Sequence, residues 1–171
     1  MKNIVILGST GSIGTNTLDI VDRFPQEFRV VGLTAGSNDE KLEAQIRKFR
    51  PAFAALANEA AAARLRDRCT DLPVKILAGD EGVAEVAQSE DAELVISAIV
   101  GGAGLLPTLA AIRAGKQIAL ANKEPMVMAG ALMQAEAKKH HVRIFPIDSE
   151  HSAIFQSLEG HRREDVKRII L

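Results

Sequence analysis

Three glycines at regular spacing stand between a short apolar run and the first helical pattern of the chain. Residues 3–7 read NIVIL, a continuous apolar segment typical of a strand that is buried on both faces. Gly8, Gly11 and Gly14 follow, and apolar residues then recur every three to five positions as far as Phe24. A strand, a glycine turn and a helix in this order predict a layered α/β unit whose first turn can approach a ligand closely.

Apolar runs and helical patterns continue to alternate along the chain. Further strands are predicted over residues 28–34, 52–57, 74–77, 93–99, 117–121, 142–147 and 165–171. The predicted helices cover residues 13–24, 39–49, 59–69, 81–88, 104–114, 125–140 and 152–158. This order predicts an α/β fold with a Rossmann-like, doubly wound and mostly parallel sheet and right-handed crossovers. We expect residues 1–145 to form this domain and residues 146–171 to begin a second one.

Composition excludes several classes of protein. The 171 residues carry a formal net charge of −1, with 47% hydrophobic and 25% charged residues, which indicates a folded chain without a field that recruits nucleic acid. Six Phe are the only aromatic residues, whereas stacking on single strands needs exposed aromatic faces. No apolar stretch is long enough to cross a membrane. With Cys69 as the single cysteine and no targeting peptide recognised, we expect a cytoplasmic protein with a small-molecule partner.

The glycine spacing is compatible with binding of a dinucleotide. Glycines let the backbone approach a pyrophosphate, and the following helix offers free N–H groups and a positive dipole end. The spacing is G-x-x-G-x-x-G rather than the standard G-x-G-x-x-G, and a turn that needs glycines only for packing is the alternative. The strand before it and the helix after it favour the cofactor. A nucleoside-triphosphate loop is excluded, because no Gly-Lys-Ser/Thr sequence follows.

The end of the second predicted strand bears on the choice of cofactor. Sites that prefer NAD place Asp or Glu there to bind the ribose 2′-hydroxyl. Here residues 34–38 read TAGSN, and the first carboxylate is Asp39. A 2′-phosphate would meet Ser37 and Asn38 instead, so the sequence favours NADP. The same residues can form a turn that caps the next helix, and the two roles are compatible.

Small and polar residues also follow the later strands, at the edge where such sheets bind ligands. Residues 98–104 are small and glycine-rich, which leaves room for a nicotinamide ring. Asn122, Lys123 and Glu124 come directly after the strand predicted over residues 117–121. Lys123 can neutralise an oxygen or a phosphate of a substrate, or it can simply pair with Glu124. Sequence position favours neither role.

Two carboxylates follow the strand predicted over residues 142–147. Asp148 and Glu150 flank Ser149 in a predicted loop, where both could bind one hard cation such as Mg²⁺ or Mn²⁺. The pattern is also common on protein surfaces, and a solvated or helix-capping role is the more frequent one. His151 beside it is, in the same way, more often structural.

Four stretches in a fixed order resemble one family. They are residues 6–14 (ILGSTGSIG), 98–114 (AIVGGAGLLPTLAAIRA), 119–124 (ALANKE) and 146–158 (PIDSEHSAIFQSL). Together they resemble 1-deoxy-D-xylulose 5-phosphate reductoisomerase, the NADPH-dependent enzyme of the methylerythritol phosphate route to isoprenoids. The resemblance extends over the whole chain. It implies a homodimeric enzyme that rearranges the substrate skeleton to an aldehyde and reduces that aldehyde with hydride, giving 2-C-methyl-D-erythritol 4-phosphate.

The resemblance also implies roles for the residues at the strand ends. Those for NADPH are Thr10, Gly11, Ser12 and Ile13 at the pyrophosphate, Gly36, Ser37 and Asn38 at the ribose and 2′-phosphate, and Asn122 and Glu124 at the nicotinamide. Those at the reacting centre are Lys123, Ser149 and Glu150 for the substrate, and Asp148 and Glu150 for a divalent cation (Mg²⁺, Mn²⁺ or Co²⁺). Lys123, Asp148 and Glu150 would be the catalytic residues, with the cation as a Lewis acid.

Three positions depart from the family's common pattern. Pro125 and Ser152 stand where Ser and Asn are common, and Ser37 stands where relatives can have a basic residue. Ser37 in place of a basic residue weakens the expected binding of the 2′-phosphate. The family's third metal carboxylate, phosphate-binding residues, lid and C-terminal helical domain would lie beyond Leu171, so we expect the chain alone to bind NADPH with little or no turnover.

Two alternatives come from other classes. A stand-alone NADP-sensing module would share the glycine loop, but it has no need of the Asp148 and Glu150 pair. A homoserine- or semialdehyde-type dehydrogenase would share the cofactor domain, but the Asp-Ser-Glu-His sequence at residues 148–151 does not fit that class.

Overall fold

Successive residues of the first strand, β1 (Lys2–Leu7), belong to two different cores. Ile4 and Ile6 pack in one buried apolar cluster, and Val5 and Leu7 pack in another. Because side chains alternate across a strand, β1 must be covered on both faces. This requirement explains why the segment is apolar throughout.

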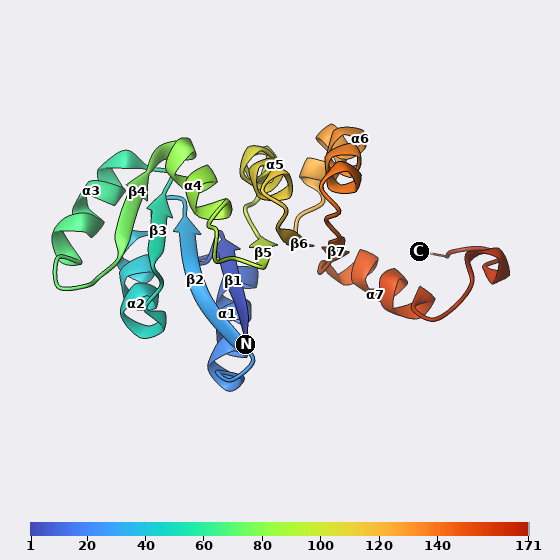
Figure 1. Ribbon diagram of the computed structural model, residues 1–171, viewed down its shortest axis with the longest axis horizontal. Coiled ribbons are helices and arrows are strands. Elements are labelled where there is room, and N and C mark those ends of the chain that lie inside the picture. Colours follow the sequence, from blue (N-terminus) through green and yellow to red (C-terminus); the bar gives the residue numbers. More distant parts are fainter. Residues whose placement is uncertain (171) are drawn as a thin grey trace.

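The computed structural model describes residues 1–170, which contain a seven-stranded sheet in the order β4-β3-β2-β1-β5-β6-β7 (Figure 1). The other strands are β2 (Phe28–Ala35), β3 (Phe53–Leu56), β4 (Lys75–Ala78), β5 (Leu94–Ser97), β6 (Gln117–Leu120) and β7 (Ile144–Pro146). Every pairing is parallel. The chain extends the sheet from β1 to one edge and then returns to extend it to the other. The predicted doubly wound fold is therefore confirmed.

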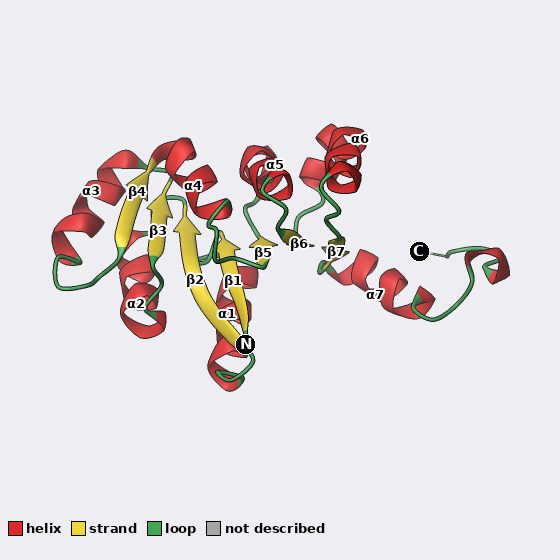
Figure 2. Ribbon diagram, in the orientation of Figure 1, coloured by secondary structure: helices red, strands yellow, loops and turns green. Residues whose placement is uncertain are grey.

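Helices cover both faces of the sheet (Figure 2). One face is covered by α1 (Ser12–Arg23), α2 (Asp39–Phe49) and α3 (Glu59–Arg68), and the other by α4 (Gly79–Ala87), α5 (Leu105–Arg113) and α6 (Glu124–Lys139). α4 contacts β3, β2 and β1 as the chain crosses back from β4 to β5. The strand order reverses at this crossing, between β1 and β5. In such sheets the carboxyl ends of the strands at this point form a ligand crevice.

Several helix boundaries follow from local side-chain chemistry. Asn38 accepts a hydrogen bond from the Lys41 amide at 3.0 Å and is the predicted cap of α2. Asn58 accepts one from the Ala61 amide at 2.9 Å and caps α3 in the same way. The predicted helix over residues 125–140 is interrupted at Ala129, where φ is −147° and ψ is 33°. Gly130 follows directly, and glycine weakens a helix at such a point.

Two predictions near the C-terminus are wrong. The last helix, α7, spans Ser149–Leu158 rather than 152–158, because Asp148 caps it by accepting from the His151 amide at 3.0 Å. The predicted strand over residues 165–171 is not formed within the described chain: Arg163–Asp165 make one 3₁₀ turn, and residues 166–170 are irregular. A strand needs a neighbouring strand to pair with, and this segment lies beyond α7, away from the sheet (Figure 1). Leu171 lies outside the described residues.

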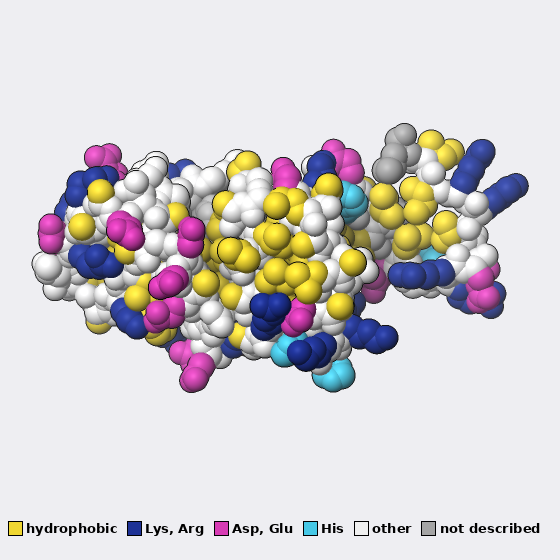
Figure 3. Space-filling view, turned by 90° about the horizontal axis from the view of Figure 1, so that it is seen from above, with side chains coloured by type: hydrophobic (Ala, Val, Ile, Leu, Met, Phe, Trp, Pro, Cys, Tyr) yellow, Lys and Arg dark blue, Asp and Glu magenta, His cyan; other side chains and the backbone are white. Residues whose placement is uncertain are grey.

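Apolar side chains gather on the outer face of α5 and α6 (Figure 3). The large exposed apolar residues of these two helices are Leu106, Val127, Met128 and Leu132. An apolar patch of this kind is typical of a surface that another part of an assembly covers. Among residues 1–170, no helix combines the length and the apolar character that a membrane crossing requires.

Candidate functional site

The glycine loop after β1 is held in place by two neighbouring elements. The amides of Gly8 and Ser9 donate to the Thr34 carbonyl in β2, at 3.1 and 2.8 Å. From α2, the Gln45 amide donates to the Ser9 carbonyl at 2.9 Å, and its carbonyl oxygen accepts from the Ser9 hydroxyl at 2.7 Å. Ser9, Thr34 and Gln45 are all buried. The fold itself therefore fixes the loop backbone in the way that precise ligand contacts require.

Packing explains two of the three glycines in this loop. Gly8 has φ of +80°, and a Cβ there would lie 2.7 Å from the Ala98 carbonyl oxygen. A Cβ at Gly14 would lie 2.5 Å from the Gly8 carbonyl oxygen, so α1 can approach the loop only with glycine at that position. Gly11 has φ of −74°, and a Cβ there would make an ordinary contact at 3.4 Å. Packing within residues 1–170 therefore does not require glycine at residue 11, whereas a ligand that approaches this residue closely would.

The first turn of α1 offers free backbone N–H groups. Gly11 is the N-cap, and no side chain within residues 1–170 caps this end of the helix. The helices α2, α3 and α7 differ, because Asn38, Asn58 and Asp148 cap them. Residues 10–13 thus surround unpaired donors and the positive end of a helix dipole. This arrangement suits a pyrophosphate.

The turn after β2 lies beside this loop and is open to solvent. Gly36, Ser37 and Asn38 are all exposed. Among residues 1–170, no heavy atom lies within 4 Å of the position that a Cβ at Gly36 would take, apart from its chain neighbours. A ligand that extends from the glycine loop toward β2 can therefore reach this turn.

Asp39, the first carboxylate after β2, is bonded to arginines of α3. Its two oxygens accept hydrogen bonds from Arg64 at 3.0 Å each, and Oδ2 also accepts one from Arg68 at 2.9 Å. The Arg64 hydrogen bonds hold the pKa of the Asp39 carboxyl well below its usual range, although burial acts in the opposite direction. Asp39 is thus occupied and cannot serve as the ribose-binding carboxylate of an NAD site. This geometry strengthens the sequence argument for a 2′-phosphate.

Polar side chains also organise the ends of β5 and β6. The Thr108 hydroxyl donates to the Gly104 carbonyl at 2.6 Å and lies 2.7 Å from the Ser97 hydroxyl. The Asn122 side-chain amide donates to the Ile99 carbonyl at 2.6 Å. These bonds fix the glycine-rich loop before α5 against the end of β6.

Lys123 and Glu124, at the start of α6, have separate surroundings. Lys123 is exposed and forms none of the ion pairs found among residues 1–170, so the interpretation as a partner of Glu124 is wrong. The Glu124 atom Oε2 is buried without a hydrogen-bond partner in the described chain. An unpaired buried acceptor costs free energy, and a donor on a ligand would satisfy it.

The paired carboxylates lie at a helix start rather than in the predicted loop. Asp148 is the N-cap of α7, and its Oδ1 atom lies 2.7 Å from the His151 atom Nδ1. Partial burial acts to raise the pKa of the Asp148 carboxyl, but the hydrogen bonds from the His151 amide and ring outweigh it and lower the pKa. Asp148 is thus ionised at neutral pH, as a ligand for a hard cation must be. Ser149 and Glu150 form the exposed first turn of α7.

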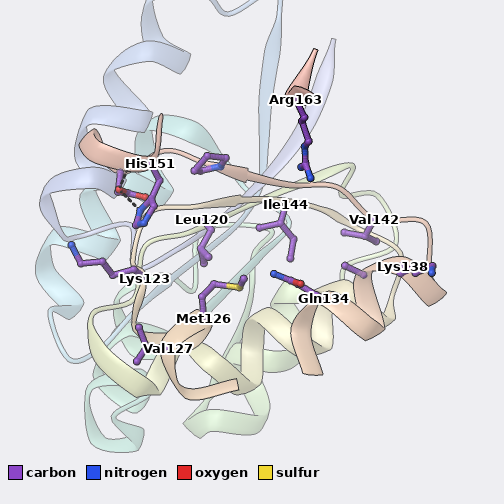
Figure 4. A pocket seen from close by; sticks show the side chains of 13 residues that line it. Leu120, Lys123, Met126, Val127, Gln134, Lys138, Val142, Ile144, His151 and Arg163 are labelled. Carbon is purple, nitrogen blue, oxygen red and sulfur yellow. Dashed lines mark hydrogen bonds and ion pairs between the residues drawn. The ribbon is translucent and has the colours of Figure 1, made fainter. Parts of the chain in front are cut away.

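A groove of about 900 Å³ joins several of these residues. Lys123 and His151 line one end of it, and Lys138 and Val142 line the other end (Figure 4). Asp148 also lines the groove and lies 2.7 Å from His151. The lysine from the start of α6 and the carboxylate from the start of α7 therefore face one space. The turn after β2 is not part of this groove, since β1, β5 and β6 separate β2 from β7 in the sheet.

The donor set for a metal ion is incomplete in the described chain. Within residues 1–170, no group of three or more His, Cys, Asp or Glu side chains is arranged to hold a metal ion. Two carboxylates are nevertheless a common protein contribution to a Mg²⁺ site, where water and substrate oxygens supply the other ligands.

Comparison with known proteins decides the family. The family model described as 1-deoxy-D-xylulose 5-phosphate reductoisomerase matches residues 4–130. The chain belongs to the 1-deoxy-D-xylulose 5-phosphate reductoisomerase family. It is 55% identical over all 171 residues to the reductoisomerases of Geotalea uraniireducens (strain Rf4) and Chlorobaculum tepidum (strain ATCC 49652 / DSM 12025 / NBRC 103806 / TLS). These matches cover 44% and 45% of the two relatives, so the chain spans less than half the length of the curated relatives it matches.

Solved reductoisomerase structures have the same fold. One is a complex of DOX-P reductoisomerase with NADPH, fosmidomycin and magnesium, which is 47% identical with a TM-score of 0.90 over 94% of this chain and 40% of that chain. Another is the Zymomonas mobilis reductoisomerase with NADPH, 39% identical with a TM-score of 0.92 over 98% of this chain and 44% of that chain. A homoserine dehydrogenase from Archaeoglobus fulgidus, at 21% identity and a TM-score of 0.56 over 85% of this chain and 42% of that chain, shares the fold alone.

Three residues that bond the glycine loop were not predicted from sequence. Thr34 and Gln45 hold the glycine loop, and the Lys41 ammonium donates to the Thr10 carbonyl at 2.8 Å. For Gln45, the sequence offered only a polar residue next to the apolar Ile46 in the predicted helix, which does not show that its side chain reaches the glycine loop. For Lys41, the sequence offered only its place near a helix start.

Proposed function

We propose that this chain is the NADPH-binding portion, with part of the metal and substrate site, of a reductoisomerase acting on 1-deoxy-D-xylulose 5-phosphate. The product would be 2-C-methyl-D-erythritol 4-phosphate. One observation carries the proposal: the expected site residues lie along one edge of the sheet, at the carboxyl ends of β2, β1, β6 and β7, in that spatial order. A dinucleotide followed by a substrate can bind along such an edge. The 55% identity to a reductoisomerase over the whole chain supports the same conclusion.

The proposed NADPH site extends from the adenosine end to the nicotinamide end. The residues assigned to it are Gly36, Ser37 and Asn38 for the ribose and 2′-phosphate, Thr10, Gly11, Ser12 and Ile13 for the pyrophosphate, and Asn122 and Glu124 for the nicotinamide. The uncapped N-terminus of α1 and the unpaired Oε2 atom of Glu124 within residues 1–170 fit this cofactor. The first is suited to an anion, and the second could accept from a carboxamide. Residues 1–145 would form this domain, and residues 146–171 would begin the catalytic one.

The proposed metal ligands are Asp148 and Glu150, with Mg²⁺, Mn²⁺ or Co²⁺ as the cation. The ionised Asp148 carboxylate and the exposed Glu150 carboxylate fit a hard cation that keeps water and substrate oxygens as further ligands. Asp148 already uses its Oδ1 atom as the cap of α7. That bond would hold the carboxylate in one orientation before the cation binds.

The chain's own residues would bind and orient the reactants. NADPH would supply hydride when bound, and the cation would supply Lewis-acid polarisation of substrate oxygens. Lys123, exposed at the groove, would neutralise negative charge on the substrate next to the Asp148 carboxylate. Ser149 and Glu150 would contact the substrate from the first turn of α7. Glu124 would hold the nicotinamide in one orientation.

The assembly and location of the whole protein are part of the same proposal. We infer a homodimer in the cytoplasm, with a sugar phosphate as the partner and neither nucleic acid nor membrane. The apolar side chains exposed on α5 and α6 support burial of that face against further protein. The family resemblance supports the rest.

Titration with NADPH, followed by nicotinamide fluorescence, tests the cofactor assignment. We expect binding by the wild-type chain and none by Gly11→Trp, because an indole at residue 11 would fill the space beside the free N–H groups of α1. Circular dichroism should show that the variant is folded. Absence of NADPH binding by the wild-type chain would refute the cofactor assignment.

A turnover assay tests whether this chain alone holds the complete catalytic site. With substrate, NADPH and Mn²⁺, we expect the 171-residue chain to show little or no oxidation of NADPH. A full rate from this chain would contradict the proposal that it holds only part of the catalytic site.

A further inference from the structure

Lys41 connects the two loops that flank the adenosine end of the proposed NADPH site. Its backbone amide donates to the Asn38 side chain at 3.0 Å, which fixes it in the first turn of α2. Its ammonium group donates to the Thr10 carbonyl at 2.8 Å, in the glycine loop after β1. One side chain thus extends from the turn after β2 to the loop that faces the pyrophosphate.

A lysine is electrostatically unfavourable at this point of a helix. The N-terminus of a helix carries partial positive charge and prefers acidic side chains, as Asp39 and Glu40 in the same turn illustrate. Lys41 is also exposed, and it forms none of the ion pairs found among residues 1–170. Its only hydrogen-bond acceptor in the described chain is the neutral Thr10 carbonyl, so two of its three N–H donors are left for another acceptor.

The charged side chains between α2 and α3 do not use the Lys41 charge. Their ion pairs join three carboxylates to three guanidinium groups: Asp39, Glu43 and Asp71 with Arg47, Arg64 and Arg68. This cluster is balanced without Lys41. The positive charge at the open end of β2 is therefore left to attract an anion.

We propose that Lys41 is the residue that selects NADPH over NADH, by pairing its ammonium with the 2′-phosphate. This inference rests on the proposed function, and it adds a specificity residue to that site. Residues 35–40 contain no cation, so Lys41 is the first positive charge after β2. The strand that follows the glycine turn is the one whose end contacts the ribose in such folds. The neutral side chains of Ser37 and Asn38 would add hydrogen bonds but no charge.

The pyrophosphate is the competing target for this ammonium. Thr10 belongs to the loop that faces the pyrophosphate, and an ammonium beside it could reach that group too. NADPH and NADH share the pyrophosphate and differ in the 2′-phosphate. The ratio of their affinities therefore separates pairing with the 2′-phosphate from the two other roles, which are pairing with the pyrophosphate and a purely structural bond between α2 and the loop.

The test is a set of fluorescence titrations with NADPH and with NADH on the wild-type chain, Lys41→Met, Lys41→Arg and Lys48→Met. Lys48 is the matched control, because it lies on α2 and pairs with Asp22 at 2.9 Å. We expect Lys41→Met to weaken NADPH about 10-fold or more while NADH changes less than about twofold, since a charge-assisted bond is lost for one ligand only. Lys41→Arg should keep the preference for NADPH, and Lys48→Met should match the wild-type chain.

The other possible results show whether the specificity role of Lys41 or the proposed NADPH binding is wrong. If Lys41→Met weakens NADPH and NADH equally, Lys41 binds the pyrophosphate or holds the loop, and the specificity role is refuted. If Lys41→Met keeps the wild-type affinity for both, the inference fails while the proposed function stands. If the wild-type chain binds neither dinucleotide, the proposed function fails as well. Circular dichroism of each variant distinguishes these results from unfolding.

Discussion

The loop after β1 and the helix α7 both carry proposed site residues, but they are held in different ways. Buried side chains of β2 and α2, Thr34 and Gln45, bond the backbone of the loop. In contrast, every residue of α7 is exposed or half-buried, and β7 beside it is half-buried throughout. An edge-on contact between Phe145 and Phe155, with ring centroids 6.3 Å apart, joins α7 to β7.

The comparison shows where the order of each region comes from. The loop after β1 is bonded to buried residues of the core, so opening this loop exposes much apolar surface. The helix α7 buries little apolar surface, so its local opening should require the least free energy. Ligands should therefore change the stability of α7 more than that of the glycine loop.

Gly14→Ala should have the largest effect on stability. A Cβ at this position would lie 2.5 Å from the Gly8 carbonyl oxygen and from the Ser9 Cα, and backbone atoms cannot rotate away. We expect the free energy of unfolding to fall by about 2–3 kcal/mol, measured by urea denaturation.

Gly11→Ala is the matched control for this substitution, because its Cβ would make only an ordinary contact at 3.4 Å. We expect a change in the free energy of unfolding within about 0.5 kcal/mol, together with weaker NADPH binding. If Gly11→Ala destabilised the chain as much as Gly14→Ala, the loop glycines would all serve packing, and the ligand argument for residue 11 would be lost.

Asp39→Asn tests the ion pairs that hold α2 to α3 at the cofactor end. Arg64 lowers the pKa of the folded Asp39 carboxyl below its ordinary value of 3.8. Since the folded pKa lies below the unfolded one, the stabilisation is present above pH 3.8 and is lost as the pH falls from there toward the folded pKa. We expect Asp39→Asn to be less stable than the wild-type chain at about pH 7, with a smaller loss on acidification to about pH 2. Urea denaturation at both pH values measures this.

Asp22→Asn is the comparison variant for this test, because its pair with Lys48 leaves both side chains more than half exposed, at 54% and 55%. Exposed pairs contribute little, so it should behave like the wild-type chain. Equal pH dependence of Asp39→Asn and the wild-type chain would show that the cluster between α2 and α3 does not stabilise the fold.

The sequence predicted the first half of the molecule better than the last. The strand β1 and the helix α2 are marked by local signals, an apolar run in one and the Asn38 cap in the other. The sequence at residues 148–151 is compatible with a loop of two carboxylates or with an Asp cap followed by an acidic first turn. The structure has the cap. The strand predicted over 165–171 needed a partner strand, which no local pattern encodes.

The supports of the glycine loop could not be predicted, because they come from distant residues. Gln45 bonds Ser9 across 36 positions, and Lys41 bonds Thr10 across 31. Such contacts depend on how α2 packs beside β1. Local periodicity predicted that α2 exists and which face is apolar, but not which polar group on it reaches the loop.

Gln45→Ala should have an intermediate effect and should act at the cofactor end only. It removes both bonds to Ser9, which is buried, and leaves the Ser9 hydroxyl and carbonyl without their partner. We expect a loss of about 1–2 kcal/mol in the free energy of unfolding. NADPH affinity should fall as the loop loosens, while amide hydrogen exchange in α7 should not change. Unchanged NADPH affinity would show that Gln45 is a core residue with no part in positioning the loop.

The smallest global effect is expected from Asp148→Ala. It removes the cap of α7, which contributes about 1 kcal/mol, and α7 shares little surface with the core. Urea denaturation of the whole chain should be almost unchanged, while the amides of α7 should exchange about fivefold faster.

Glu150→Gln separates the capping role of Asp148 from metal binding, because it keeps the cap and removes one proposed metal ligand. Without metal, its α7 amides should exchange as in the wild-type chain. With Mn²⁺, exchange in α7 should slow for the wild-type chain and for neither variant, because only the wild-type chain keeps both carboxylates. If the α7 amides of the wild-type chain already exchanged as slowly as those of β1 without metal, the two regions would not differ in stability, and metal binding would have no local disorder to remove.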